Sequence, residues 1–118
     1  MWSKLQEIFD YFEKEYNITY SRQGSFAEGE ELPQSFFTFW NADSNGLFHY
    51  DNKDHKTKWF WYVYFYTNDP SIIYSKLEEF IKLAKEKGFN VDGKGHDIPS
   101  DITYYLGRYV RLTYVEDN

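Results

Sequence analysis

The longest apolar run of the chain spans residues 58–67, which read Lys-Trp-Phe-Trp-Tyr-Val-Tyr-Phe-Tyr-Thr. Because side chains alternate along a β-strand, one face of this predicted strand carries Trp59, Trp61, Val63 and Phe65. The other face carries Phe60, Tyr62, Tyr64 and Tyr66. Neither face is polar. The pattern therefore predicts a strand that is covered on both sides, and a second protein molecule is a candidate for one of the covers.

Residues 3–16 show the period of an amphipathic helix. Its predicted buried stripe recurs at helical spacing and consists of Leu5, Ile8, Phe9, Phe12 and Tyr16. Ser3 followed by Gln6 fits a capping box, in which the Ser3 hydroxyl closes the first turn. We expect Asn17 to end this helix.

A second amphipathic helix follows the aromatic strand. The pair Asp69 and Pro70 predicts its start, with Asp69 as the capping residue and Pro70 at the first helical position. Lysines in the C-terminal half suit the helix dipole, and Gly88 supplies a left-handed residue that ends the helix. The predicted buried stripe is Ile73, Leu77, Phe80, Ile81 and Ala84.

The other predicted strands are shorter than the aromatic one. Residues 35–40 and 47–51 are expected to form a hairpin around the turn dipeptide Asn45-Gly46. Alternation of apolar and polar residues predicts a final strand at 108–115. Brief strands are expected at 18–22 and 89–91, and exposed loops at 23–34 and 92–101.

This order of elements predicts the α+β class. We expect an antiparallel or mixed sheet of about 4–6 strands with two helices packed on one face. The length of 118 residues suits a single domain, 1–118, with one two-layer core. The open face of such a sheet is usually polar. Here one aromatic face of residues 58–67 would be left bare, which argues for a partner.

The amino-acid composition is compatible both with a recognition surface and with an ordinary small core. Aromatic residues make up 23% of the chain, and Tyr is the most frequent of them with 12 residues. A Tyr excess fits a small core whose hydroxyl groups reach water. It also fits an interface, where Tyr and Trp are enriched. Both interpretations stay open at this point.

Charge and cysteine content exclude several classes of function. The formal net charge of −6 disfavours nonspecific binding of nucleic acid, because phosphate groups are neutralised by Lys and Arg, and no direct sequence-specific binding of nucleic acid is expected either. The chain has no cysteine, which excludes disulfides and thiolate metal sites. The N-terminus lacks the pattern of a signal peptide, and no apolar window is long enough to span a membrane, so no membrane partner is expected.

Candidate catalytic and metal-binding residues are few. His49 and His55 lack the spacing typical of ligands in a metal site. Residues 92–96, Asp-Gly-Lys-Gly-His, lack the first glycine and the Ser/Thr of a phosphate-binding loop, and they follow a helix instead of opening one. Two acids in a polar loop, Asp97 and Asp101, are expected to be solvated. We therefore expect no enzyme activity, no cofactor and no metal.

A longer pattern combines residues 59–73, the helix at 75–84 and the segment 88–97. An N-terminal helix and a strand introduced by Leu32-Pro33 precede it, and a closing strand at 109–116 follows. In this pattern the chain resembles the small minor capsid or tail terminator proteins of long-tailed bacteriophages and their prophages. The likeness covers most of the chain and includes no catalytic signature.

The resemblance implies a structural protein that assembles as a ring, typically a hexamer, on the last ring of the tail tube. Such a ring stops growth of the tube and presents the surface that joins the head. The implied partners are copies of the chain itself, the tail tube protein and a head completion or connector protein. The implied location is the head–tail junction of the virion, and the host cytoplasm during assembly. A neighbouring head–tail connector position is equally compatible.

Interface residues are expected on the aromatic strand and in the polar loops at 23–34, 41–46 and 92–101. The candidate residues are Phe60, Tyr62, Tyr64, Tyr66, Glu28, Glu30, Glu31, Lys94 and His96.

Three other classes of function stay open. An acidic stand-alone binding protein, such as an inhibitor that fills the basic groove of a nucleic-acid enzyme, would use the three glutamates of the 23–34 loop. A small-ligand-binding domain or enzyme would need a closed pocket between sheet and helices. Aromatic residues combined with Arg22, Arg108 and Arg111 imitate a platform for single-stranded nucleic acid, although basic residues are few.

Overall fold

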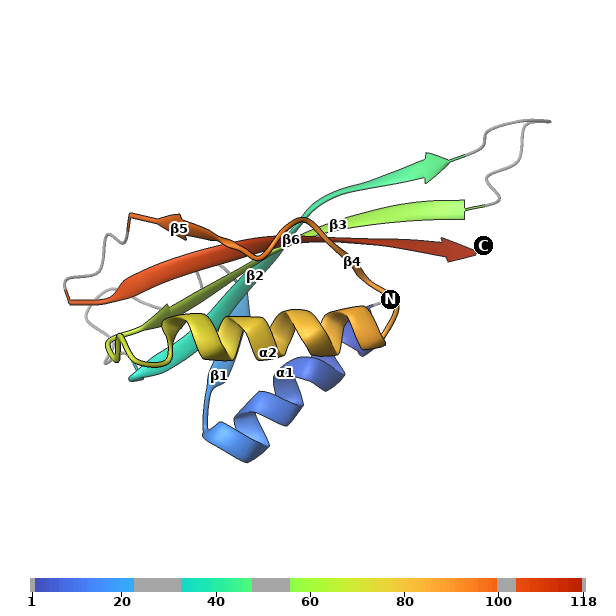
Figure 1. Ribbon diagram of the computed structural model, residues 1–118. Helices are drawn as coiled ribbons and strands as arrows, with labels where there is room; N and C mark the ends of the chain where they lie inside the picture. Colours follow the sequence, from blue (N-terminus) through green and yellow to red (C-terminus); the bar gives the residue numbers. More distant parts are fainter. Residues whose placement is uncertain (1, 23–32, 48–55, 100–103, 118) are drawn as a thin grey trace.

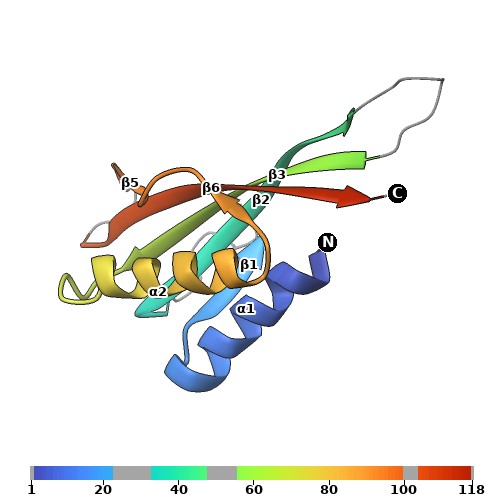
Figure 2. The same cartoon turned by 45° about the vertical axis from the view of Figure 1, so that its right-hand side comes forward.

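The computed structural model of the chain describes residues 2–22, 33–47, 56–99 and 104–117. Its elements are α1 (Trp2–Tyr16), β1 (Thr19–Arg22), β2 (Ser35–Leu47), β3 (Lys56–Thr67), α2 (Ile73–Glu86), β4 (Asn90–Val91), β5 (His96–Ile98) and β6 (Leu106–Asp117). Both helices lie on the same side of one mixed six-stranded sheet (Figures 1 and 2). The predicted α+β fold with helices on one face is confirmed.

The sheet has the strand order β1-β2-β3-β6-β4, and β5 also pairs with β6. β1 runs parallel to β2, whereas all other pairs are antiparallel. The first loop, 23–32, lies outside the described residues. The long strands β2, β3 and β6 stand at the centre and reach beyond the helices at one end (Figure 1).

Phenylalanine rings from both layers form the core. Phe37 of β2 packs against Phe65 of β3 with ring centroids 4.9 Å apart, and against Phe80 of α2 at 5.3 Å. Phe9 of α1 lies 5.5 Å from Phe37 and 5.7 Å from Phe80. Both predicted helix stripes are buried here, with the exception of Tyr16, which is exposed. These aromatic side chains bury much area per residue and so allow a short chain to close its core.

The alternation predicted for the aromatic strand is confirmed. Trp61, Val63 and Phe65 of β3 are buried under the helices. Tyr62, Tyr64 and Tyr66 are half-buried and lie on the other side of the sheet, which no described helix covers. β3 also begins two residues earlier than expected.

The predicted hairpin of residues 35–40 and 47–51 is wrong. β2 continues through Asn45-Gly46 and pairs with β3 along its whole length, with a bulge between Asn41 and Asp43. The preference of Asn-Gly for a turn is local, whereas pairing with β3 supplies a continuous ladder of backbone hydrogen bonds to the longest apolar strand. The connection, 48–55, lies outside the described residues.

Both predicted helix starts are also wrong. α1 includes Trp2, so Ser3 lies inside its first turn and is not the cap. α2 begins only at Ile73, and no side chain caps it. Asp69 instead stabilises the turn before the helix, because its Oδ1 accepts hydrogen bonds from the backbone N–H of Ser71 at 3.0 Å and its hydroxyl at 2.7 Å. The predicted ends are confirmed: Asn17 and Gly88 adopt positive φ angles of 57° and 95°.

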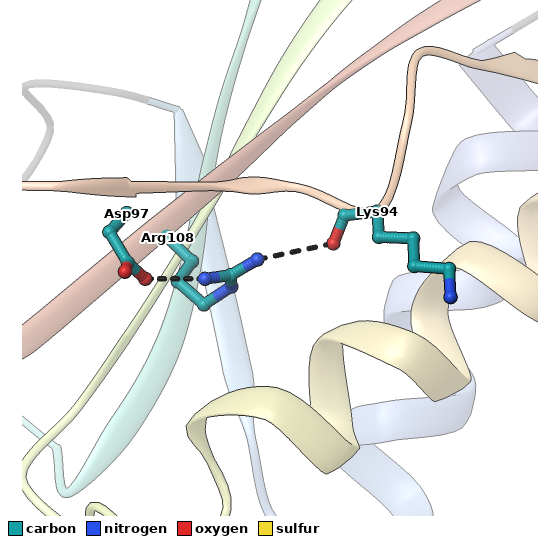
Figure 3. Close-up of polar contacts among 3 residues, drawn as sticks. All are labelled: Lys94, Asp97 and Arg108. Atoms are coloured by element: carbon teal, nitrogen blue, oxygen red, sulfur yellow. Dashed lines mark hydrogen bonds and ion pairs between the residues drawn. The ribbon is translucent and has the colours of Figure 1, made fainter.

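The strand predictions at 18–22, 89–91 and 108–115 are confirmed with shifted ends, as β1, β4 and β6. The predicted loop at 92–101 contains a strand, β5, which pairs with β6. Arg108 of β6 holds this segment: it donates to the Asp97 carboxylate and, at 3.3 Å, to the carbonyl oxygen of Lys94 (Figure 3). β5 is short and polar, so hydrophobic alternation gave no signal for it.

Candidate functional site

The side of the sheet opposite the helices carries a continuous set of aromatic residues. The strand register places Thr38, Tyr64 and Tyr109 in one row across β2, β3 and β6, and Trp40, Tyr62 and Arg111 in the next. We call this surface the open face, and its described members include Phe36, Thr38, Trp40, Lys58, Phe60, Tyr62, Tyr64, Tyr66, His96, Tyr109, Arg111, Thr113 and Val115. None of the described helices covers it (Figure 2).

The rings of the open face hold one another in place. Trp40 stacks on Tyr62 with centroids 4.9 Å apart and planes 12° apart. Tyr109 lies 6.2 Å from Tyr62 and 5.7 Å from Tyr64, and the His96 ring of β5 lies 5.2 Å from Tyr109. The surface thus extends over four strands, and its side chains lose little conformational entropy when a partner binds.

The open face is apolar in its rings and polar at their tips. The Trp40 indole N–H points to the Tyr64 hydroxyl at 3.4 Å, a long hydrogen bond, and Trp40 is 36% exposed. Thr38 Oγ1 is buried and has no hydrogen-bond partner in the described part of the chain. Side chains of this amphipathic kind suit a surface that is wet in one state and covered in another.

One end of the open face is closed by the chain itself. Phe36 is 1% exposed because Tyr66 stacks on it at 5.3 Å and Tyr105 packs beside it at 6.0 Å. The Tyr105 hydroxyl donates to the carbonyl oxygen of Pro33 at 2.7 Å, which fixes this cover. The accessible part of the open face therefore centres on the rows of Trp40 and Tyr64.

The basic residues lie mostly away from these rings. Of the three arginines considered for a stacking platform, only Arg111 lies on the open face. Arg22 sits over Phe39 and Arg108 over Tyr74 of α2, both on the helix side. The open face also carries Lys58, whose Nζ lies 5.1 Å from the centre of the Phe60 ring. Two cations among the described side chains are few for a surface that must neutralise phosphates.

Titratable groups with shifted pKa values lie on the helix side. A hydrogen bond to Glu79 raises the pKa of the Tyr16 hydroxyl. Burial, opposed by a hydrogen bond with Gln6 and supported by one to Asp10, raises the pKa of Tyr20. The Lys87 ammonium, which hydrogen-bonds Glu7 at 2.6 Å, lowers the pKa of that carboxyl. The two bonds from Ser71 lower the pKa of Asp69. These groups stabilise turns and helix contacts and do not converge on one point.

The structure brings together part of the predicted interface set. Phe60, Tyr62, Tyr64 and Tyr66 share the open face, and β5 adds His96 to it. Lys94 is exposed in the turn before β5, where only its carbonyl oxygen has a described partner, Arg108. The acidic residues Glu28, Glu30 and Glu31 lie outside the described residues, as do the loop residues 48–55.

Sequence reasoning missed the contributions of β2 and β6. Trp40, Tyr109 and Arg111 lie on the open face beside the predicted tyrosines. The alternation of residues 108–115 places Tyr109 and Arg111 on a common face of their strand, and this much was predictable from the sequence. The pairing of β3 with β6, which brings both residues next to Tyr62 and Tyr64, is not readable from the sequence alone.

The described residues offer little for catalysis. They contain no group of three His, Asp or Glu side chains that could hold a metal ion, and His49 and His55 lie outside them. Asp97 is paired with Arg108, and Asp101 lies outside. Buried apolar side chains fill the middle of the layer between helices and sheet, and a hollow of about 370 Å³ lies at its edge, between the end of α1 and the starts of β2 and α2.

A comparison of the sequence with models of known protein families and with curated proteins finds no match. Among the helices that the structure describes, none has the length and apolar character needed to cross a bilayer.

Proposed function

We propose that the protein is a non-enzymatic assembly subunit that associates with copies of itself through the open face. The observation that carries the proposal is the set of packed, partly exposed rings around Trp40, Tyr62 and Tyr64 on the side of the sheet that the described helices leave bare. Exposed aromatic surfaces of this kind mark sites of association. Rigid Tyr and Trp side chains are also the residues that dominate binding energy in protein interfaces.

The assembly we propose is a tail terminator ring of a long-tailed bacteriophage or prophage. Such a ring, typically a hexamer, would sit on the tail tube protein and meet a head completion or connector protein at the head–tail junction of the virion. Support comes from the resemblance in the order of elements and from the two-layer α+β fold. A neighbouring connector position would use the same surface in the same way.

A nucleic-acid platform is less well supported by the same geometry. The aromatic rings are suitable, but Arg111 already pairs with Asp92, Nη2 to Oδ2 at 3.1 Å, and the chain carries a net charge of −6. The acidic inhibitor hypothesis rests on Glu28, Glu30 and Glu31, which lie outside the described residues. The inhibitor hypothesis leaves the aromatic surface unexplained, whereas the nucleic-acid platform would explain the rings but not the acidic net charge.

The direct test replaces two rings of the open face. In the double variant Tyr62→Ser/Tyr64→Ser, we expect a folded chain that no longer associates, because both rings are half-buried on the bare side of the sheet. Tyr74→Ser is a matched control, since Tyr74 is 56% exposed on α2 and far from the open face. Circular dichroism reports folding, and light scattering reports association. A double variant that associates like the wild type would refute the proposal.

A further inference from the structure

A shallow hollow of about 260 Å³ indents the open face near β4. Its lining includes Phe60, two cations, Lys58 and Arg111, and one carboxylate, Asp92. Arg111 and Asp92 pair with each other at 3.1 Å. Lys58 lies over the Phe60 ring and forms no ion pair with any carboxylate in the described part of the chain. The hollow therefore presents, beside an aromatic ring, a cation that has no carboxylate partner among the described side chains.

The outer side of α1 carries carboxylates and an aromatic ring, which are complementary to the cation and the ring of the hollow. The helix contains four carboxylates and two lysines. Glu7 is engaged by Lys87, and Asp10 accepts a hydrogen bond from Tyr20. Tyr11, which is 39% exposed, and the exposed Glu15 are four residues apart and so lie on the same side of the helix. Together they offer a ring and a carboxylate to a partner.

Charge argues against stacking two open faces on each other. Stacking two open faces would bring Lys58 and Arg111 of both copies into one contact, while Asp92, a carboxylate beside them, already pairs with Arg111. Burying an unpaired charge is costly. Docking of α1 supplies a carboxylate for Lys58. Because α1 lies on the opposite side of the sheet (Figure 2), that contact joins two different surfaces, an arrangement that forms a ring when the rotation between copies closes and a filament when it does not.

We propose that α1 of one copy docks on the open face of the next, with Glu15 beside Lys58 and Tyr11 against Phe60. The inference rests on the proposed function and specifies which surface of the neighbouring copy covers the open face. Glu15 of one copy forms an ion pair with Lys58 of the next. The Tyr11 ring packs against the Phe60 ring, over which Lys58 lies.

Charge reversal tests the contact. We expect Glu15→Lys and Lys58→Glu each to weaken self-association at least about tenfold, because like charges then face each other. Glu86→Lys, which reverses another exposed helix carboxylate, is the matched control and should leave association unchanged. An equimolar mixture of E15K and K58E should associate again, because every contact between alternating copies is then either the original or the reversed pair. Sedimentation velocity over a concentration series measures each case.

The outcomes separate this inference from the proposed function. If the wild type associates and both single reversals associate equally well, the docking of α1 is overturned while self-association stands. Docking of α1 is likewise overturned if the mixture fails to recover association. If the wild type stays monomeric at every concentration, the proposed function fails and this inference fails with it. Unchanged melting temperatures of the single variants exclude unfolding as the cause of a loss.

Discussion

The Trp40 indole lies parallel to the Tyr62 ring, with centroids 4.9 Å apart and planes 12° apart, although the two residues come from different strands. Both rings lie on the side of the sheet that the described helices leave uncovered. An aromatic pair so arranged is packed before any partner arrives. It is the structural basis for regarding this surface as an interface and the helix-covered side as the core.

The two sides of β2 should respond differently to truncation. Phe37→Ala removes a fully buried ring and should lower the free energy of unfolding by about 3–5 kcal/mol. Trp40→Ala removes a larger ring that is 36% exposed, and should cost less, about 2 kcal/mol with the stacking on Tyr62 included. Urea denaturation of the two variants gives both values. Equal losses would mean that the open face belongs to the core.

Gly95 should tolerate a side chain less well than Gly93. Both have positive φ, 97° and 75°, so alanine at either position costs about 1 kcal/mol or more in backbone strain. A Cβ atom at Gly95 would also lie 2.7 Å from Leu77 Cδ2 and 3.3 Å from the Tyr109 carbonyl oxygen, whereas Gly93 has nothing within 4 Å. We expect Gly95→Ala to melt at a clearly lower temperature than Gly93→Ala. Equal melting temperatures would contradict the packing of this segment.

Asp97 should anchor β5 to β6. The Arg108 side chain is 11% exposed and Asp97 is 72% exposed, so Asp97→Asn leaves a nearly buried cation with a weaker partner and should cost about 1 kcal/mol. Asp92→Asn is the matched control, because its partner Arg111 is 43% exposed and loses less. Hydrogen exchange should show faster exchange at His96–Ile98 in the first variant only. Unchanged protection there would show that Arg108 does not hold the strand.

The ion pair of Glu7 with Lys87 should make stability depend weakly on pH. The pKa of Glu7 lies below its ordinary value of 4.5, so its contribution is present above that value and is lost as the pH falls through the lowered pKa. Glu7→Gln should therefore melt slightly below the wild type at neutral pH, and the two melting curves should converge in acid. A difference that persists at low pH would assign the effect to something other than this charge.

Helical periodicity was the most reliable guide to the fold. The stripe of α2, from Ile73 to Ala84, is buried as predicted. A helix places apolar residues of this spacing on one face, which can then be buried against the sheet as a unit. Local signals were weaker. Asn45-Gly46 did not form a turn, and Asp69 capped a turn before the helix instead of the helix itself. In each case tertiary pairing or the path of the chain outweighed a preference of two or three residues.

The candidate site was only partly predictable for a different reason. Alternation placed Tyr62 and Tyr64 on a common face of the strand, but it is silent on which face the helices cover. Long-range pairing added Trp40 and Tyr109, and Arg108 drew β5 and His96 to the sheet edge. These contacts join residues far apart in the chain, so no local pattern contains them.

The most direct test of the central claim is the native mass of the full chain across a concentration series, measured by light scattering and sedimentation. Self-association through the open face predicts a mass that rises with concentration and levels off at one closed species, a ring of about six copies in the tail terminator assembly we propose. A mass that stays at that of one chain at every concentration would contradict it.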